Sequence, residues 1–102
     1  MSEQDKLMQT LGLAQKAGKL ASGDTAVRLA AKAGKAELLL LAGDASENSC
    51  KAITDLAAYR QLKIVKCLDK QRLGLALGKA PRTAVAVLDK GFCEMIKKIF
   101  PI

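Results

Sequence analysis

The 102-residue sequence contains no histidine and no tryptophan, and it has only one tyrosine and two phenylalanines. Without histidine, the chain lacks the side chain that most often serves as a general base near neutral pH and most often binds transition metals. Neither a serine–histidine nor a cysteine–histidine pair can form, so we expect no enzyme activity. The scarcity of aromatic rings also argues against binding of single-stranded nucleic acid by base stacking.

The pattern of cysteines excludes two further kinds of site. Cys50, Cys67 and Cys93 are odd in number and include no C-x-x-C pair, so neither a disulfide framework nor a zinc motif is indicated. Each has apolar neighbours, and we expect three reduced thiols that pack as small core side chains and bind no metal. No cofactor is expected.

Long hydrophobic runs are missing too. No run of apolar residues is longer than five, as in residues 38–42, whereas a membrane-spanning helix needs about 20. Residues 1–6 lack the basic and apolar regions of a signal peptide. We therefore expect a cytoplasmic protein without membrane attachment, folded as one domain over residues 1–102.

Acidic residues are scarce in the second half of the chain. Residues 1–50 contain six Lys or Arg and six Asp or Glu, whereas residues 51–102 contain eleven and four, which account for the whole net charge of +7. This asymmetry suggests a polyanionic partner. The alternative is a soluble surface with a basic bias.

The residues that are present alternate between helix and strand patterns. Expected helices cover residues 3–17, 24–32, 47–60, 69–78 and 90–100, and expected strands cover residues 19–22, 37–42, 62–68 and 83–88. The apolar runs Leu38–Leu41 and Ala84–Val87 predict central strands, because only a sheet covered on both faces accommodates them. Helices separated by strands predict a three-layer α/β/α domain.

Helix caps can be predicted from the same pattern. Ser46 or Asn48 is expected to cap the third helix, Asp69 the fourth and Asp89 the last, which Pro101 ends. For the second helix, the candidates are Ser22 and Asp24. On the last helix Met95 is expected to face inward, and Tyr59 is expected to be half-buried at the edge of the core.

A glycine turn at Gly23 leads from the first strand into the second helix. The backbone N–H groups at a helix start favour phosphate, especially with cations nearby. Arg28, Lys32 and Lys35 form a basic stripe, although Arg28 can also pair with Asp24 one turn earlier. No P-loop accounts for the three Gly-Lys pairs, because none has the required spacing followed by serine or threonine.

Several short motifs recur in one order along nearly the whole chain. They are residues 11–14, 16–20, 22–24, 38–41, 44–48, 54–55, 73–74, 78–79, 85–87 and 91–92. In this order they resemble the kink-turn RNA-binding superfamily of ribosomal proteins, the L7Ae and L30e group, and more closely its bacterial YlxQ-like branch. The resemblance implies a three-layer α/β/α sandwich with a mixed four-stranded sheet. It also implies RNA contacts from residues 23–28, 44–48 and 79–83.

The resemblance implies binding of structured, kink-turn-like RNA, with ribosomal RNA as a candidate, and we expect the chain to be a monomer. The residues expected to contact RNA are Lys19, Gly23, Asp24, Thr25, Arg28, Lys32, Asp44, Lys79 and Arg82. A helix cap is the alternative role for Asp44, and a solvated loop is the alternative setting for Lys79 and Arg82.

The chain departs from the family pattern at three positions. Members that bind kink-turns well have Asn, Glu and Lys where this chain has Thr25, Ala26 and Leu29. We therefore expect weaker and less selective binding, since base-reading side chains are missing while phosphate contacts remain. The alternative is a protein-interaction module on the same fold, in which an exposed Leu29 belongs to the contact with a partner.

Overall fold

The two apolar runs of the sequence form the centre of a four-stranded mixed sheet. In the computed structural model, which describes residues 2–100, β2 (Leu38–Leu41) and β4 (Ala84–Val87) pair antiparallel and are buried throughout. Strand β1 (Leu20–Ser22) pairs antiparallel with β4 at one edge, and β3 (Ile64–Lys66) pairs parallel with β2 at the other. The predicted central strands and the predicted edge strand are confirmed.

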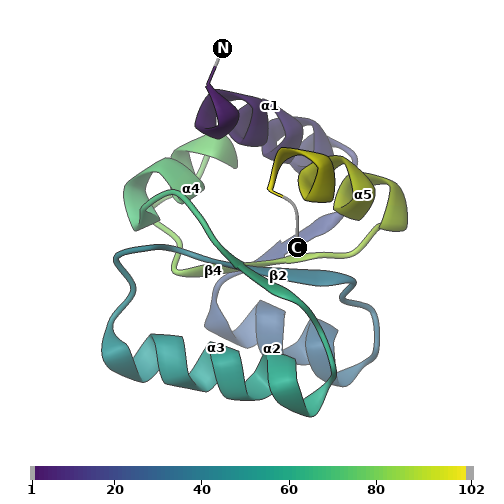
Figure 1. Cartoon of the computed structure of the whole chain (residues 1–102), viewed down its shortest axis with the longest axis vertical. Coiled ribbons are helices and arrows are strands. Elements are labelled where there is room, and N and C mark those ends of the chain that lie inside the picture. The colour runs from purple at the N-terminus through teal and green to yellow at the C-terminus, as the bar shows by residue number, and fades with distance from the viewer. Residues whose placement is uncertain (1, 101–102) are drawn as a thin grey trace.

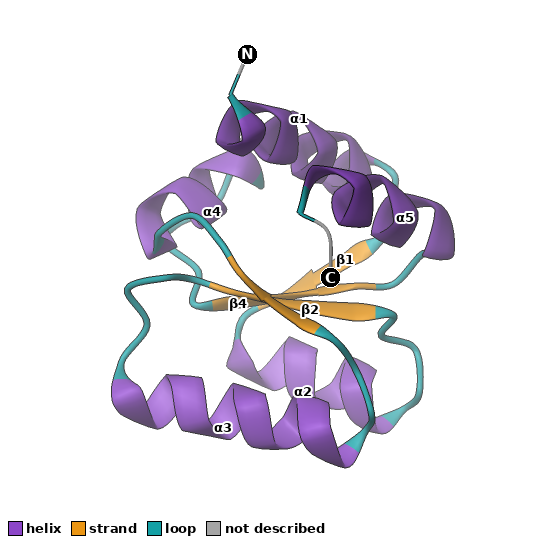
Figure 2. Ribbon diagram, viewed as in Figure 1, coloured by secondary structure: helices purple, strands orange, loops and turns teal. Residues whose placement is uncertain are grey.

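Five helices cover the two faces of the sheet (Figure 1). They are α1 (Glu3–Lys16), α2 (Asp24–Lys32), α3 (Glu47–Tyr59), α4 (Lys70–Ala76) and α5 (Lys90–Ile99). Helices α1, α4 and α5 form one layer, and α2 and α3 lie side by side in the other (Figure 2). The predicted α/β/α sandwich is therefore confirmed. Among residues 2–100, no helix combines the length and the apolar character needed to cross a membrane.

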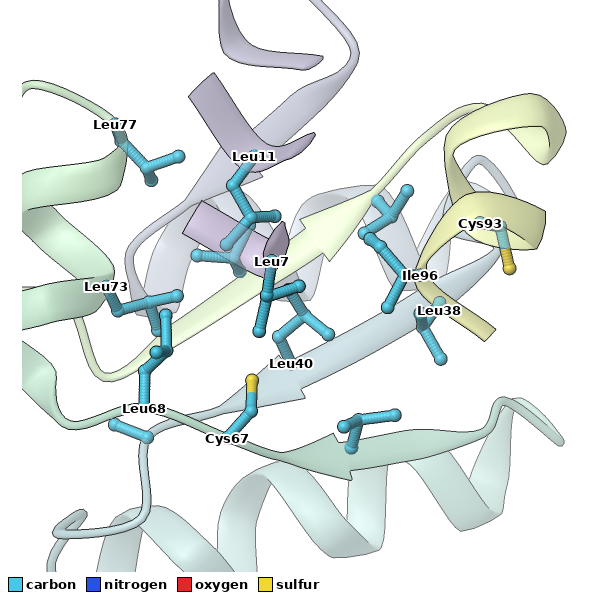
Figure 3. Packing of buried hydrophobic residues seen from close by; sticks show 14 residues of the cluster. Leu7, Leu11, Leu38, Leu40, Cys67, Leu68, Leu73, Leu77, Cys93 and Ile96 are labelled. Atoms are coloured by element: carbon cyan, nitrogen blue, oxygen red, sulfur yellow. The ribbon is translucent and has the colours of Figure 1, made fainter. Parts of the chain in front are cut away.

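Each face of the sheet has its own apolar core. Beneath α1, α4 and α5, the side chains of Leu7, Leu11, Leu73 and Ile96 converge on alternate residues of the central strands (Figure 3). On the opposite face, the residues of α2 and α3 that pack on Leu39, Leu41, Ala84 and Ala86 are Val27, Ala30, Ile53 and Ala57. Because successive strand side chains point to opposite faces of the sheet, each central strand packs against both helix layers.

Two of the cysteines belong to the first of these cores. Cys67 and Cys93 are buried, as expected for small core side chains, and Cys50 is partly buried. Burial raises the pKa of the Cys67 thiol from an ordinary value of 9.0 to about 12.

The structure corrects several expectations. Strand β3 is shorter than residues 62–68, because the Leu62 N–H still donates to the Ala57 carbonyl of α3 at 2.8 Å and Leu68 adopts a φ of 55°. Met95 is 43% exposed, because Cys93 and Ile96 are the buried residues of α5. Tyr59 is 78% exposed, because Ile53 and Ala57 form the buried face of α3. The predicted effect of Pro101 on α5 lies outside the described residues.

Candidate nucleic-acid interface

Three helices begin at one end of the sheet, where β1, β2 and β3 finish. Strands β1, β2 and β3 run into α2, α3 and α4 there, and the loop before the antiparallel β4 returns to the same edge. Backbone hydrogen bonds join the segments: Gly23 donates to the Ala84 carbonyl at 3.2 Å, and Ala42 donates to the Thr83 carbonyl at 2.8 Å. We call residues 23–28, 44–48 and 79–83 the loop edge; its β2–α3 loop and the neighbouring start of α4 lie on the left in Figure 2.

The sheet order explains why these segments meet. Because three strands lead into their helices at the same end of the sheet, the positive ends of three helix dipoles lie together. In sequence, the segments are about twenty and thirty residues apart, and only the pairing of β1 and β2 with β4 brings them side by side. The loop edge thus has the polarity that favours an anionic ligand.

The start of α2 differs from the other two helix starts. Gly23 has φ 92° and ψ 156°, a conformation open to glycine, and no side chain caps the helix. The prediction of a cap by Ser22 or Asp24 is wrong: the Ser22 hydroxyl accepts a hydrogen bond from Nε of Arg82 at 3.3 Å, and Asp24 is the first helical residue. The first N–H groups of α2 are therefore not engaged by a side-chain cap.

The starts of α3 and α4 are capped as predicted. The Ser46 hydroxyl accepts a hydrogen bond from the Ser49 N–H at 3.2 Å, and the Asp69 carboxylate accepts one from the Arg72 N–H at 2.7 Å. Asp44 also acts as a cap, but on α4, because its carboxylate accepts a hydrogen bond from the Lys70 N–H at 2.9 Å. Asp44 thereby fixes the β2–α3 loop to α4; an RNA contact from it stays a prediction.

The loop before β4 is fastened to both neighbouring segments. Besides its bond to Ser22, the Arg82 guanidinium donates to the carbonyls of Ala80 and Pro81 at 3.2 and 3.3 Å. The backbone N–H of Arg82 donates to the Lys70 carbonyl at 3.0 Å. The Arg82 side chain therefore shapes this loop, whereas the exposed Lys79 is left facing solvent.

Two hollows open at the loop edge. The larger, of about 550 Å³, is lined by Asp44, Lys70, Gln71, Leu75, Lys79 and Pro81. The smaller, of about 200 Å³, is lined by Asp24, Arg28, Asn48, Ser49, Ala52 and Ile53. The larger hollow combines apolar carbon from Leu75 and Pro81 with two ammonium groups, a combination that suits a planar base and its phosphate.

Lys70, Gln71 and Leu75 line the larger hollow but were not predicted from the sequence. A partial signal was available, since Lys70 follows the predicted cap Asp69 directly, but the pairing of β3 with β2 is known only from the structure. A residue in the first turn of that helix has to lie at the same edge as the β2–α3 loop. Leu75 has no comparable signal, because the sequence alone does not distinguish an exposed leucine on a short helix from a core leucine.

Two of the predicted site residues lie away from the loop edge. Lys19 is at the other end of β1, where its carbonyl accepts a hydrogen bond from Leu88 at 2.9 Å. Lys32 is at the C-terminal end of α2, about 12 Å along the helix axis from Asp24. The structure brings together Gly23, Asp24, Thr25, Arg28, Asp44, Lys79 and Arg82.

The suggested ion pair between Asp24 and Arg28 is not present. Within residues 2–100, the carboxylate–cation pairs at 4.0 Å or less are Asp69–Arg72 and Glu94–Lys97. Arg28 is exposed and lines the smaller hollow beside Asn48. Its guanidinium is consequently available to a ligand at the start of α2.

Known proteins share the sequence pattern. The profile of the ribosomal protein L7Ae/L30e/S12e/Gadd45 family matches residues 5–96. RNA-binding protein YlxQ of Bacillus subtilis (strain 168) is 38% identical over 86 residues, which cover 84% of this chain and 86% of the relative. RNA-binding protein YlxQ of Enterococcus faecium is 31% identical over 94 residues, which cover 92% and 90%.

Solved structures share the fold. A protein of unknown function from Bacillus halodurans C superposes with a TM-score of 0.86 at 30% identity, covering 91% of this chain and 94% of that one. A 15.5kD RNA binding protein of Giardia lamblia gives a TM-score of 0.77 at 17% identity, covering 95% and 83%, and shows the fold alone. These findings confirm the predicted resemblance and fold class. Both curated relatives are named as RNA-binding proteins and not as enzymes, in line with the expectation from the sequence.

Proposed function

Because the chain belongs to the ribosomal protein L7Ae/L30e/S12e/Gadd45 family, we propose that it binds structured RNA through the loop edge. The observation that carries the proposal is the convergence of three helix N-termini there, with Arg28 beside the uncapped start of α2 and Lys70 and Lys79 at the larger hollow. The names of the YlxQ relatives, which state RNA binding, support it.

The loop edge supplies two kinds of RNA contact. The N–H groups of the first turn of α2 and the nearby cations attract phosphates, which position the RNA without reading its sequence. The larger hollow accepts a base that has left the stack, because Leu75 and Pro81 offer it an apolar surface. Structured RNA with a sharp bend presents both features together.

Base reading by α2 is weak in this chain. Thr25 is exposed and offers one hydroxyl, Ala26 offers no hydrogen-bonding side chain, and Leu29 is 64% exposed. We propose a kink-turn-like RNA as the target, with ribosomal RNA as the leading candidate, bound by a monomer in the cytoplasm. Selectivity for the kink-turn is lower than in relatives that carry Asn, Glu and Lys at these positions.

Charge neutralisation tests the proposed surface. In the variant Arg28→Gln/Lys79→Gln, affinity for a kink-turn RNA falls about tenfold or more at low salt, and the slope of log affinity against log salt falls by about 1.5. The control Lys16→Gln/Lys90→Gln removes the same charge from exposed positions at the opposite edge and changes affinity far less. Equal losses in both variants would mean that net charge alone, and no particular face, attracts the RNA.

Restoring the missing side chains tests the proposed selectivity. The variant Thr25→Asn/Ala26→Glu/Leu29→Lys gains preference for a kink-turn over a plain duplex, by about 1–3 kcal/mol for each base contact regained. Competition between the two RNAs measures the preference directly. Tight and selective kink-turn binding by the unaltered chain would contradict the lower selectivity.

A protein-interaction module is the second candidate function, and the exposure of Leu29 favours it. An apolar side chain that is 64% exposed stands where strong RNA binders have a lysine. Contact with a protein through Leu29 would resist salt, whereas phosphate contacts weaken steeply with it. Substitution Leu29→Gln would then weaken the protein complex and leave RNA affinity unchanged.

A further inference from the structure

A second basic region lies at the other end of the strands from the loop edge, where α2 and α3 end. Arg60, which follows α3, donates from Nε to the Ala31 carbonyl at 2.9 Å and from Nη2 to the Lys32 carbonyl at 2.6 Å. These two bonds tie the end of α3 to the end of α2. Both helices lie on the same face of the sheet, side by side (Figure 1).

An aromatic ring stands exposed beside this junction. Tyr59 is 78% exposed, and the Arg60 guanidinium carbon lies 5.9 Å from the centre of its ring. The two residues also line a hollow of about 270 Å³ together with Gly34 and Gln61. A ring that has a cation over one face and is largely exposed resembles the surface on which proteins stack a single base.

The charges around the ring favour a phosphate chain. The C-terminal end of a helix carries partial negative charge, which repels anions. Here the Arg60 guanidinium covers two of the last carbonyls of α2, and the exposed Lys32 and Lys35 add positive charge. Asp55, one turn before Tyr59, is the acid on this part of α3. Cations therefore outnumber acids around the hollow.

A line of cations joins this region to the loop edge. Arg28 and Lys32 are one turn apart on α2 and both are exposed, so they follow one another along the same helix face. Arg28 lines the hollow at the start of α2, and the Lys32 carbonyl holds Arg60 at its end. The two ends of α2, at Asp24 and Lys32, are about 12 Å apart along the helix axis, which is short enough for one RNA strand to reach both.

We propose that Lys32, Lys35, Tyr59 and Arg60, here called the distal patch, bind a single-stranded extension of the RNA held at the loop edge, with one base stacked on Tyr59. The proposal rests on the proposed function, because the structured part of the RNA occupies the loop edge. A single ring accommodates a single base. The patch therefore adds affinity for an adjacent unpaired strand, and does not make the chain a general single-strand binder.

Three kinds of RNA probe test the distal patch. One is a kink-turn hairpin, and the others carry an added unpaired stretch of about eight nucleotides at the 5′ or the 3′ end, within the usual size of a single-strand site. The unaltered chain binds one of the extended probes about five- to tenfold more tightly than the hairpin. Tyr59→Ala removes that gain and leaves hairpin affinity unchanged, and Tyr59→Phe keeps it.

Charge variants separate stacking from attraction. Lys32→Gln/Lys35→Gln reduces the gain from the extension, whereas Lys16→Gln/Lys90→Gln leaves it intact. Arg60 stays unaltered, because its bonds to α2 support the fold. Equal affinity of the unaltered chain for all probes would overturn the distal patch and leave the loop edge standing. Failure to bind even the hairpin would overturn the proposed function, and the distal patch with it.

Discussion

Gly74 controls how closely the loop before β4 approaches α4. A Cβ atom at this position would collide with the Ala80 carbonyl oxygen and come within 2.7 Å of the Ala80 carbonyl carbon. The glycine has an ordinary helical backbone, so the requirement is for space and not for an unusual φ. Because position 74 has no side chain, the loop that carries Lys79 and Arg82 can pack directly on α4.

Substitution of Gly74 by alanine tests this contact. Because the carbonyl of Ala80 has to move, Gly74→Ala lowers the free energy of unfolding by about 1–3 kcal/mol and weakens RNA binding through the displaced loop. Gly12→Ala in α1 is the matched control: its Cβ meets Ala76 at an ordinary 3.5 Å, and the added methyl stabilises the helix by about 0.5–1 kcal/mol. Urea unfolding of both variants measures the difference, and equal stability of the two would refute the role of Gly74.

Cys67 makes stability depend on pH in the alkaline range. Since burial raises its pKa from 9.0 to about 12, the folded state holds a proton that the unfolded state releases. The stabilisation is complete below pH 9 and is lost as pH rises toward 12, by at most about 1.4 kcal/mol per pH unit. Urea midpoints between pH 8 and pH 11 should fall more steeply for the unaltered chain than for Cys67→Ala. Parallel curves would show that the thiol titrates normally.

Helices α2, α3 and α4 begin at the same edge but differ in what caps them. The local sequence correctly predicts Ser46 and Asp69 as caps, because each accepts a hydrogen bond from the helix that directly follows it. It fails at α2, since the Ser22 hydroxyl is taken by Arg82, sixty residues later. It also fails to connect Asp44 with Lys70, because that hydrogen bond depends on β2 and β3 being neighbours.

The cap that Asp44 provides can be separated from any contact it makes with RNA. Asp44→Ala lowers the free energy of unfolding by about 1 kcal/mol, as loss of a cap does, and Asp69→Ala has a similar effect. Asp44→Asn keeps an acceptor oxygen and loses less. If Asp44→Ala unfolds at the same urea concentration as the unaltered chain, the bond to Lys70 contributes nothing to stability. RNA affinity of Asp44→Asn then reports separately on the carboxylate.

At the scale of the whole molecule, the apolar pattern predicts the layers better than it predicts the surface. Leu38–Leu41 and Ala84–Val87 are buried runs, and burial on both faces leaves few alternatives to a central strand. Exposed positions such as Tyr59 and Lys32 carry no such constraint. Their place at the far end of α2 and α3 follows from helix rotation and length, which a few apolar positions define poorly.

The central claim is that RNA lies across the loop edge, and chemical-shift mapping of the labelled protein with a kink-turn hairpin tests it most directly. Amide signals of residues 23–28, 44–48, 70–71 and 79–83 should shift together as the hairpin is added. Signals on the outer faces of α1 and α5 should stay in place. The largest shifts falling on α1 and α5, with the loop edge unmoved, would contradict the account.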